Sequence, residues 1–324
     1  MKKLLCLLTV VLISLGFAAC LGGCAGDNGG LITVGFAQCY MDESDWRRAN
    51  TQNVKEALSK ENGFDLTIVD SGNDSAKQMQ DVQDFIDQGV DYILLSASED
   101  SGWDAVLKNA KDAEIPVVLL DRTINSTEDL WTCWTGADFK AEGVKAVDWL
   151  ETKFAEAEEV GILHIQGQTD AAAQKGRTEA LDEGAMRNGW TILEQHTANW
   201  STDEAKELVA EWIKKHGDRI SAVYAENDNM AKGAIEALEE AGVKYGGADG
   251  IAIISFDANR EYLQMTLEGK INVNVECNPL LGDYAREMIE MLERGEQPPK
   301  RRAVYEEVFY WDTITQEMID ARKY

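Results

Sequence analysis

The sequence is poor in the residues that mark metal or cofactor chemistry. It holds three histidines among 324 residues, and none stands near a cysteine at a metal-ligand spacing. The GxGxxG and GxxxxGK[ST] patterns that cradle phosphate groups are absent. We therefore expect no metal ion and no cofactor.

Positive charge is also scarce. Lysine and arginine number 31 against 58 aspartates and glutamates, which gives a formal net charge of -27. Nucleic acid is therefore not an expected partner, because binding its phosphates needs a basic surface. The acidity favours a soluble monomer.

Long hydrophobic runs are limited to the N-terminus. Lys2 and Lys3 precede an apolar run over residues 4–17, which is too short to span a bilayer and has the layout of an export signal. The run ends in Leu-Gly-Gly-Cys at residues 21–24, which resembles a bacterial lipobox. We predict a lipoprotein signal peptide over residues 1–23, lipidation at Cys24 and a flexible tether over residues 24–30. The alternatives are a cleaved signal without lipid, or lipidation at Cys20.

Cysteines and prolines are few. Signal removal leaves four of the six cysteines, and with Cys24 lipidated the three that remain are Cys39, Cys133 and Cys277. This odd number predicts no disulfide framework. The four prolines stand at the boundaries of predicted elements, where they are tolerated.

From residue 31 onward, short aliphatic runs alternate with stretches of helical period. This alternation predicts parallel sheets with helices on both faces, and two sheets of five or six strands each account for the number of runs. The predicted strands are 32–37, 66–69, 92–95, 117–120, 161–165, 192–195, 222–225, 251–255 and 273–275.

Unusual residues gather just after these strands. Parallel strands end at one edge of a sheet, and ligands bind in the crevice beyond that edge. The candidate binding residues at these ends are polar, charged or aromatic: Gln38, Glu43, Trp46, Arg47, Ser96, Trp103, Asp121, Arg122, Arg177, Trp200, Asn227, Asp257 and Glu276.

This set of side chains is suited to a free sugar. Carboxylate, amide and guanidinium groups bind hydroxyls in pairs, and flat aromatic rings cover the apolar faces of a sugar ring. Each residue also has a structural interpretation. Tryptophans often pack in cores, strand-end aspartates and Asn227 can cap helices, and arginines can form surface ion pairs.

Five segments together resemble the type I periplasmic binding proteins, in the pentose and hexose branch that serves ABC importers. They are VGFAQ with ESDWR (34–47), SGW (101–103), AKDAEIPVVLLDR (110–122), YAENDNMAKGAIEALEEAG (224–242) and SFD (255–257). The resemblance extends from residue 31 to residue 324 and is strongest to the galactofuranose-binding members.

The resemblance implies roles for matching residues. Asp121 and Arg122 correspond to an Asp-Arg pair that grips ring hydroxyls, with Arg177, Asn227 and Asp257 opposite them. Trp200 takes the place of a stacking aromatic, and Glu276 that of a polar residue beside the hinge. Trp46, Arg47 and Trp103 match the galactofuranose branch in particular.

Three departures concern the identity of the sugar. The loop at 39–42 is one residue longer and bulkier than in that branch, Asn199 stands where an acid is usual, and the segment 168–176 diverges.

The resemblance also implies two doubly wound lobes joined by a hinge of three strands, with a binding cleft between them. The expected lobes are residues 31–135 with 277–305, and residues 136–276 with 306–324. A sugar gripped from both lobes is expected to close the hinge and to present a new surface to an ABC permease. Membrane contact is expected only through the lipid on Cys24, outside the cytoplasm.

Three alternatives remain open at this point. A sugar-sensing protein that docks to a sensor kinase or chemoreceptor shares every feature above. A repressor core has the same two lobes but needs a basic N-terminal DNA-binding unit, which the signal replaces. A glycoside hydrolase needs a carboxylate pair such as Asp121 with Asp257, whereas an arginine beside Asp121 suits hydroxyl binding better, so no enzyme is expected.

Overall fold

The computed structural model describes residues 30–324 and contains two six-stranded sheets. The predicted signal, most of the tether and Cys24 lie outside the described residues. The first sheet has the order β11-β5-β4-β3-β1-β2 and the second the order β12-β10-β9-β8-β6-β7. The strands of the first sheet are β1 (Ile32–Gln38), β2 (Phe64–Asp70), β3 (Tyr92–Leu95), β4 (Val117–Leu120), β5 (Cys133–Gly136) and β11 (Arg301–Ala303). Those of the second are β6 (Gly161–Gln166), β7 (Thr191–Thr197), β8 (Ala222–Ala225), β9 (Ala252–Asp257), β10 (Val273–Glu276) and β12 (Val308–Tyr310).

All neighbouring strands are parallel except β10 and β12, which pair antiparallel. The predicted α/β class with two similar parallel-sheet lobes is confirmed. The nine predicted strands are all present. The sequence pattern missed β5, β11 and β12, because CWTG and RRA hold no aliphatic run and VFY has only three residues.

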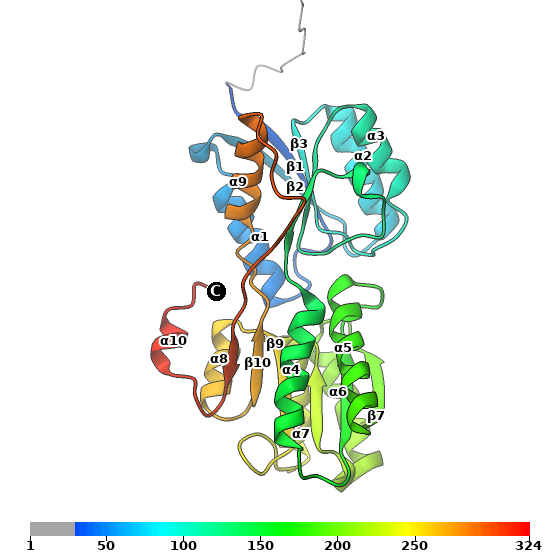
Figure 1. Ribbon diagram of the computed structural model, residues 1–324, viewed down its shortest axis with the longest axis vertical. Coiled ribbons are helices and arrows are strands. Elements are labelled where there is room, and N and C mark those ends of the chain that lie inside the picture. Colours follow the sequence, from blue (N-terminus) through cyan, green and yellow to red (C-terminus); the bar gives the residue numbers. More distant parts are fainter. Residues whose placement is uncertain (1–29) are drawn as a thin grey trace, which may run out of the picture. The chain divides into compact units, whose positions relative to one another are not determined.

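Helices cover both faces of each sheet. In the first lobe, defined here as the first sheet with its helices, α1 and α9 cover one face and α2 and α3 the other (Figure 1). In the second lobe, defined likewise, α4 and α5 pack together on one face, and α6 and α7 on the other. The helices are α1 (Asp45–Ala57), α2 (Ser75–Gln88), α3 (Asp104–Asp112), α4 (Phe139–Lys153), α5 (Ala172–Asn188), α6 (Thr202–His216), α7 (Asp228–Glu240), α8 (Arg260–Leu267), α9 (Gly282–Glu293) and α10 (Gln316–Asp320).

The chain crosses between the sheets three times. It leaves the first sheet after β5, returns after β10 and leaves again between β11 and β12 (Figure 1). Cys277 follows β10 directly, and Tyr305 stands between the two edge strands. The order of the strands therefore builds a hinge of three segments; the residue limits of the lobes stay a prediction.

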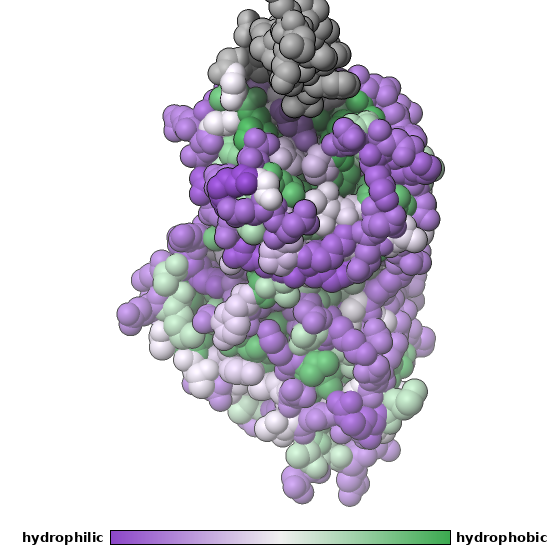
Figure 2. All heavy atoms as spheres, turned by 45° about the horizontal axis from the view of Figure 1, so that its top comes forward, coloured by the Kyte–Doolittle hydropathy of each residue, from purple (hydrophilic) through white to green (hydrophobic). Residues whose placement is uncertain are grey.

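The central strands of both sheets are buried, as expected when helices cover both faces. On the face of Figure 2, hydrophilic residues predominate and hydrophobic ones lie in small groups. Among residues 30–324, no helix has the length and apolarity that a membrane crossing requires.

Candidate functional site

A small cavity lies between the carboxyl ends of the two sheets, with about 310 Å³ of empty space that includes open solvent. Its lining comes from both lobes and from one crossing segment. The lining residues are Glu43, Ser44, Trp46, Arg47, Asp121, Arg122, Phe139, Ala173, Arg177, Trp200, Asn227, Asp257 and Cys277.

The first lobe contributes two arginines and two acids that pair among themselves. Arg122 Nη2 donates to both carboxylate oxygens of Glu43 at 2.8 Å. Arg47 Nη2 donates to Asp121 Oδ2 at 2.7 Å, and its Nε lies 3.4 Å from Glu43 Oε2. Burial opposes ionisation of Glu43, but the two guanidinium groups hold its pKa below the ordinary value. The result is a buried network with no net charge and with rigid donors and acceptors.

Helix α1 begins at this network for a local reason. The Ser44 hydroxyl accepts from the backbone N–H of Arg47 at 3.2 Å and caps the helix. The cap sets the first turn of α1 against the cavity, so that Trp46 and Arg47 both line it.

The second lobe contributes Arg177 from α5. Its Nε donates to Glu142 Oε2 at 2.7 Å, and Nη1 donates to the backbone carbonyl of Glu226. Nη2 lies 3.7 Å from Asp257 Oδ1. Burial raises the pKa of Asp257 well above its ordinary value, an effect that Arg177 only partly opposes. Asp257 is therefore suited to share a proton or a hydrogen bond with a ligand hydroxyl.

Aromatic rings form the apolar part of the wall. The indole N–H of Trp46 donates to the backbone carbonyl of Cys277 over 2.6 Å. The Trp200 ring lines the cavity, and its buried Nε1 has no protein acceptor among the described residues. Phe139 adds a third ring. A ligand with flat apolar faces and many hydroxyls fits this mixture.

Three cavity residues hold left-handed backbone that glycine normally adopts. The φ angles are +66° at Asp121, +67° at Trp200 and +100° at Asp257. Neither aspartate caps a helix: the residue before α8 is Asn259, and Asp121 bonds Arg47. Asn227 does cap α7, because its side-chain oxygen accepts from the backbone N–H of Met230. It also lines the cavity. Strained backbone of this kind concentrates at binding sites.

Nine of the thirteen predicted site residues line this cavity. They are Glu43, Trp46, Arg47, Asp121, Arg122, Arg177, Trp200, Asn227 and Asp257.

The other four lie elsewhere, with their polar atoms used by protein partners. Gln38 is fully buried and donates to Asn50 and Thr51. Ser96 accepts from Arg47 Nη1 at 3.0 Å and so supports a lining residue from behind.

Trp103 is fully buried in the core between α2, α3 and the first sheet. Its ring packs against apolar side chains there and does not line the cavity. Its Nε1 donates to the carbonyl of Glu99. Glu276 accepts from Arg322, from the Tyr324 hydroxyl and from the backbone N–H of Glu307, which ties the C-terminus to the hinge.

Four lining residues were missed: Ser44, Phe139, Ala173 and Cys277. Ser44 and Ala173 are small residues beside helix starts, which carry no chemical signal. Phe139 and Cys277 follow β5 and β10, and the predicted crossings near residues 135 and 277 point to this region.

The lobes touch at two further places. Asn229 Nδ2 and the Tyr262 hydroxyl each donate to Asp45 Oδ2 at 2.9 Å, and Lys175 Nζ donates to Asp100 Oδ2 at 2.8 Å. Partial burial opposes ionisation of Asp45, but hydrogen bonds from Tyr262, Arg48 and Asn229 hold its pKa below the ordinary value. These contacts describe a closed arrangement of the two lobes.

Fold and cavity together define a two-lobed solute-binding protein that encloses a small polar ligand between its lobes. A family profile described as a periplasmic binding protein domain matches residues 34–297. The galactofuranose-binding protein YtfQ of Escherichia coli K12 is 32% identical over 297 residues, which cover 90% of this chain and 92% of that protein.

Two solved structures are similar over most of their length. A Mycobacterium smegmatis protein in complex with β-D-fucofuranose is 36% identical with a TM-score of 0.82, covering 90% of this chain and 93% of that one. The periplasmic component of the arabinose ABC transporter of Shewanella sp. ANA-3, bound to α- and β-L-arabinofuranose, is 32% identical with a TM-score of 0.83, covering 90% and 95%. The chain therefore belongs to the type I periplasmic binding proteins, in the sugar-binding branch of the ribose and galactose binders.

Proposed function

We propose that this protein captures a monosaccharide in its furanose form and delivers it to the permease of an ABC importer. The observation that carries the proposal is the cavity between the lobes, which is lined by charged groups and aromatic rings from both of them. Three similar proteins support the furanose form, since one is named as a galactofuranose-binding protein and the other two were solved with fucofuranose and with arabinofuranose.

The chemistry of the wall favours binding over catalysis. The guanidinium groups of Arg47 and Arg122 are hydrogen-bonded to carboxylates of the same wall, so these acids serve as positioned acceptors for hydroxyls. The similar proteins are named as a galactofuranose-binding protein and as the periplasmic binding component of an arabinose ABC transporter, which fits a protein without enzymatic activity.

Hinge closure would couple capture to delivery. A sugar that contacts both lobes binds the closed form better than the open form, and so shifts the equilibrium between them. Closure then presents a surface that a permease can recognise. Cys24 would hold the protein at the outer face of the membrane through its lipid, and the protein would act there as a monomer.

Isothermal titration calorimetry on the protein from residue 25 tests the ligand class. Arabinose, galactose, fucose and ribose form the first panel. A ring-form pair follows: 5-deoxyarabinose, which lacks the hydroxyl needed to close a pyranose ring, and methyl arabinopyranoside, which cannot open to a furanose. We expect binding of the first and none of the second. Tight binding of the pyranoside alone would contradict the furanose proposal, and no binding by the whole panel would contradict the monosaccharide proposal.

Delivery and anchoring need cells. Metabolic labelling with palmitate should mark the wild-type protein and leave a Cys24→Ser variant unlabelled, with Cys20→Ser as the matched control. Uptake of the bound sugar should fall when the gene is removed. Unchanged uptake together with intact binding would point instead to a sensory partner.

A further inference from the structure

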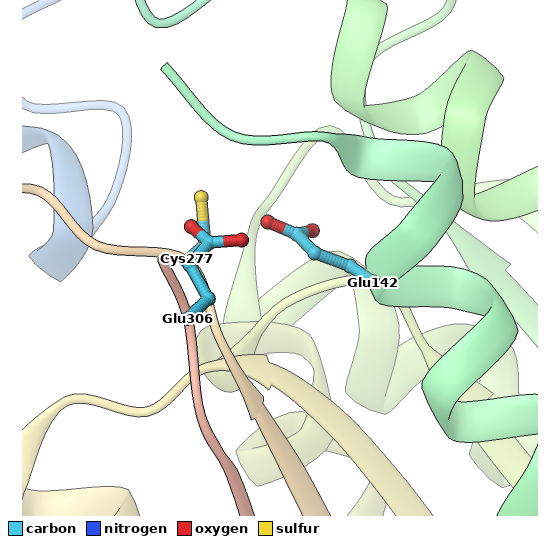
Figure 3. A group of neighbouring side chains, drawn as sticks. All are labelled: Glu142, Cys277 and Glu306. Atoms are coloured by element: carbon cyan, nitrogen blue, oxygen red, sulfur yellow. The ribbon is translucent and has the colours of Figure 1, made fainter. Parts of the chain in front are cut away.

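Three buried side chains meet at the hinge, each from a different segment. Glu142 stands on α4, Cys277 in the second crossing segment and Glu306 in the third. One carboxylate oxygen of Glu142, one of Glu306 and the Sγ atom of Cys277 all lie within 4.8 Å of one another. Figure 3 shows the carboxyl groups of Glu142 and Glu306 pointing toward each other, with the Cys277 sulfur beside them.

The hydrogen bonds around these acids leave one atom without a donor. Glu142 Oε2 accepts from Arg177 Nε at 2.7 Å, and Glu306 Oε1 accepts from the backbone N–H of Asn278 at 2.9 Å. Glu142 Oε1 is buried and has no partner among the described residues. A buried acceptor without a donor is costly, and two ionised carboxylates cannot bond to each other. A single proton between them supplies the missing donor.

Burial and the repulsion between the two acids favour this proton, whereas the neighbouring cations oppose it. Asp257 faces the cluster from the end of β9, and the cations nearby are Arg177 and Lys145, whose Nζ donates to the backbone carbonyl of Glu306. Burial raises the pKa of Glu306 to about 10, and the charge of Glu142 adds to this rise. Burial also raises the pKa of the Cys277 thiol well above its ordinary value, so the thiol stays neutral.

We propose that Glu142 and Glu306 share one proton across the neutral pH range, and that Glu306 is thereby a positioning residue for Arg177. The protonated pair holds the Glu142 carboxylate toward Arg177, whose guanidinium lines the cavity. The proton itself does not depend on any ligand, whereas its effect on binding rests on the proposed function.

The proton makes stability depend on pH with a defined sign. A glutamate in the unfolded chain loses its proton near its ordinary pKa of about 4.3, while the folded pair keeps it up to pH of about 10. Between these values the folded state binds one proton more than the unfolded state. The stabilisation is therefore complete below the ordinary pKa and is lost progressively as the pH rises toward the folded pKa.

Glu306→Gln tests the proposal, because it keeps the shape, stays neutral at every pH and can donate to Glu142. Glu307→Gln is the matched control, with the same change at the neighbouring exposed residue. Denaturant unfolding without sugar, at pH values from 6 to 9, gives the unfolding equilibrium constant. We expect that constant to rise with pH more steeply in wild type than in Glu306→Gln, by up to tenfold per pH unit. Equal slopes in the two proteins overturn the shared proton.

A second measurement detects the proton directly in the wild-type protein, and the variant serves only to assign the resonance. In wild-type protein with ¹³C-labelled glutamate carboxyl groups, NMR should show one glutamate still protonated at pH 7, and Glu306→Gln should lack that resonance. A spectrum with every glutamate ionised at pH 7 overturns the proposal. So does one equivalent of a divalent metal that persists through dialysis and is lost in Cys277→Ser, since an ion would then take the place of the proton.

The positioning role has its own readout. Where a sugar ligand has been found, Glu306→Gln should keep its affinity within about threefold of wild type and remove the loss of affinity that wild type shows toward pH 10. Glu306→Ala should lose at least tenfold at neutral pH. If Glu306→Ala binds as wild type does while the NMR proton is present, the positioning role is overturned and the proton stands.

Discussion

The Tyr262 hydroxyl donates to Asp45 Oδ2 across the two lobes, over 2.9 Å. Tyr262 lies on α8 of the second lobe, and Asp45 opens α1 of the first. The bond forms only where the lobes meet, so it adds to the closed form and not to the open one.

Removing this hydroxyl should therefore weaken capture without altering the cavity wall. We expect Tyr262→Phe to lower sugar affinity about three- to tenfold, the worth of one hydrogen bond of about 0.5–1.5 kcal/mol. Calorimetry measures it, with Tyr245→Phe as control, because that hydroxyl bonds Glu239 within one lobe. Equal affinity in both variants would show that this contact does not select the closed form.

The same contact predicts a dependence on acid. Hydrogen bonds from Tyr262 and Asn229 of the second lobe, together with Arg48 of the same helix, hold the pKa of Asp45 below its ordinary value. The part that comes from the second lobe stabilises the closed form above the ordinary pKa and is lost as the pH falls through the lowered one. Affinity should thus decline more between pH 5 and pH 3 in wild type than in Asp45→Asn. Titrations across this range check it, and parallel curves would argue against a role for Asp45 ionisation.

Cutting the first-lobe network should be far more costly. Asp121→Ala leaves the buried Arg47 guanidinium without its 2.7 Å partner, and breaking such a pair costs about 3–5 kcal/mol. We expect affinity to fall at least a hundredfold, with a lower melting temperature. Asp129→Ala is the control, since Asp129 is exposed and pairs with Lys111 at the surface. A loss within a few-fold at Asp121 would mean that the cavity is not the binding site.

A methyl group at Gly167 should displace the Trp200 ring. A Cβ added there would lie 1.9 Å from the nearest ring carbon, so the ring has to move. We expect Gly167→Ala to lower affinity at least tenfold. A double-mutant cycle checks the cause: in a Trp200→Leu background the same change should cost much less. Additive losses would place the effect in the backbone rather than in the ring.

The three described cysteines should differ in their protection by ligand. Cys39, Cys133 and Cys277 are all free and buried, and burial raises the pKa of each thiol. Only Cys277 lines the cavity. At mildly alkaline pH, a small alkylating reagent should modify Cys277 slowly and more slowly still with bound sugar, as mass spectrometry of its peptide can show. Modification of Cys133 serves as the internal reference, and equal protection of both would contradict a ligand beside Cys277.

Much of the site could be predicted because parallel strands end at one edge. Asp121, Arg122 and Asp257 are each placed by the strand that they terminate or follow, so the position in the sequence determines the position in space. Trp103 shows the limit of that argument. Trp103 also follows a strand, but its ring lies in the core. This could not be predicted, because the sequence does not indicate which way a side chain in a loop points.

The hinge was harder to predict in detail. β11 reads Arg-Arg-Ala, which is typical of an exposed loop, and it is a strand only because β5 offers a free edge. Glu142 and Glu306 look like surface acids in a chain with 58 acidic residues. Their burial follows from the crossing of three distant segments, which no local pattern records.

The left-handed backbone at Asp121, Trp200 and Asp257 lowers the stability of the fold at positions whose side chains line the cavity. Each such non-glycine residue costs the fold about 1–3 kcal/mol. Glycine at any of the three would relax the chain while deleting a side chain that lines the cavity. Selection for stability alone would therefore favour glycine at these three positions and remove the cavity-lining side chains there first. Retention of the three side chains in related proteins would then indicate continued selection for ligand binding.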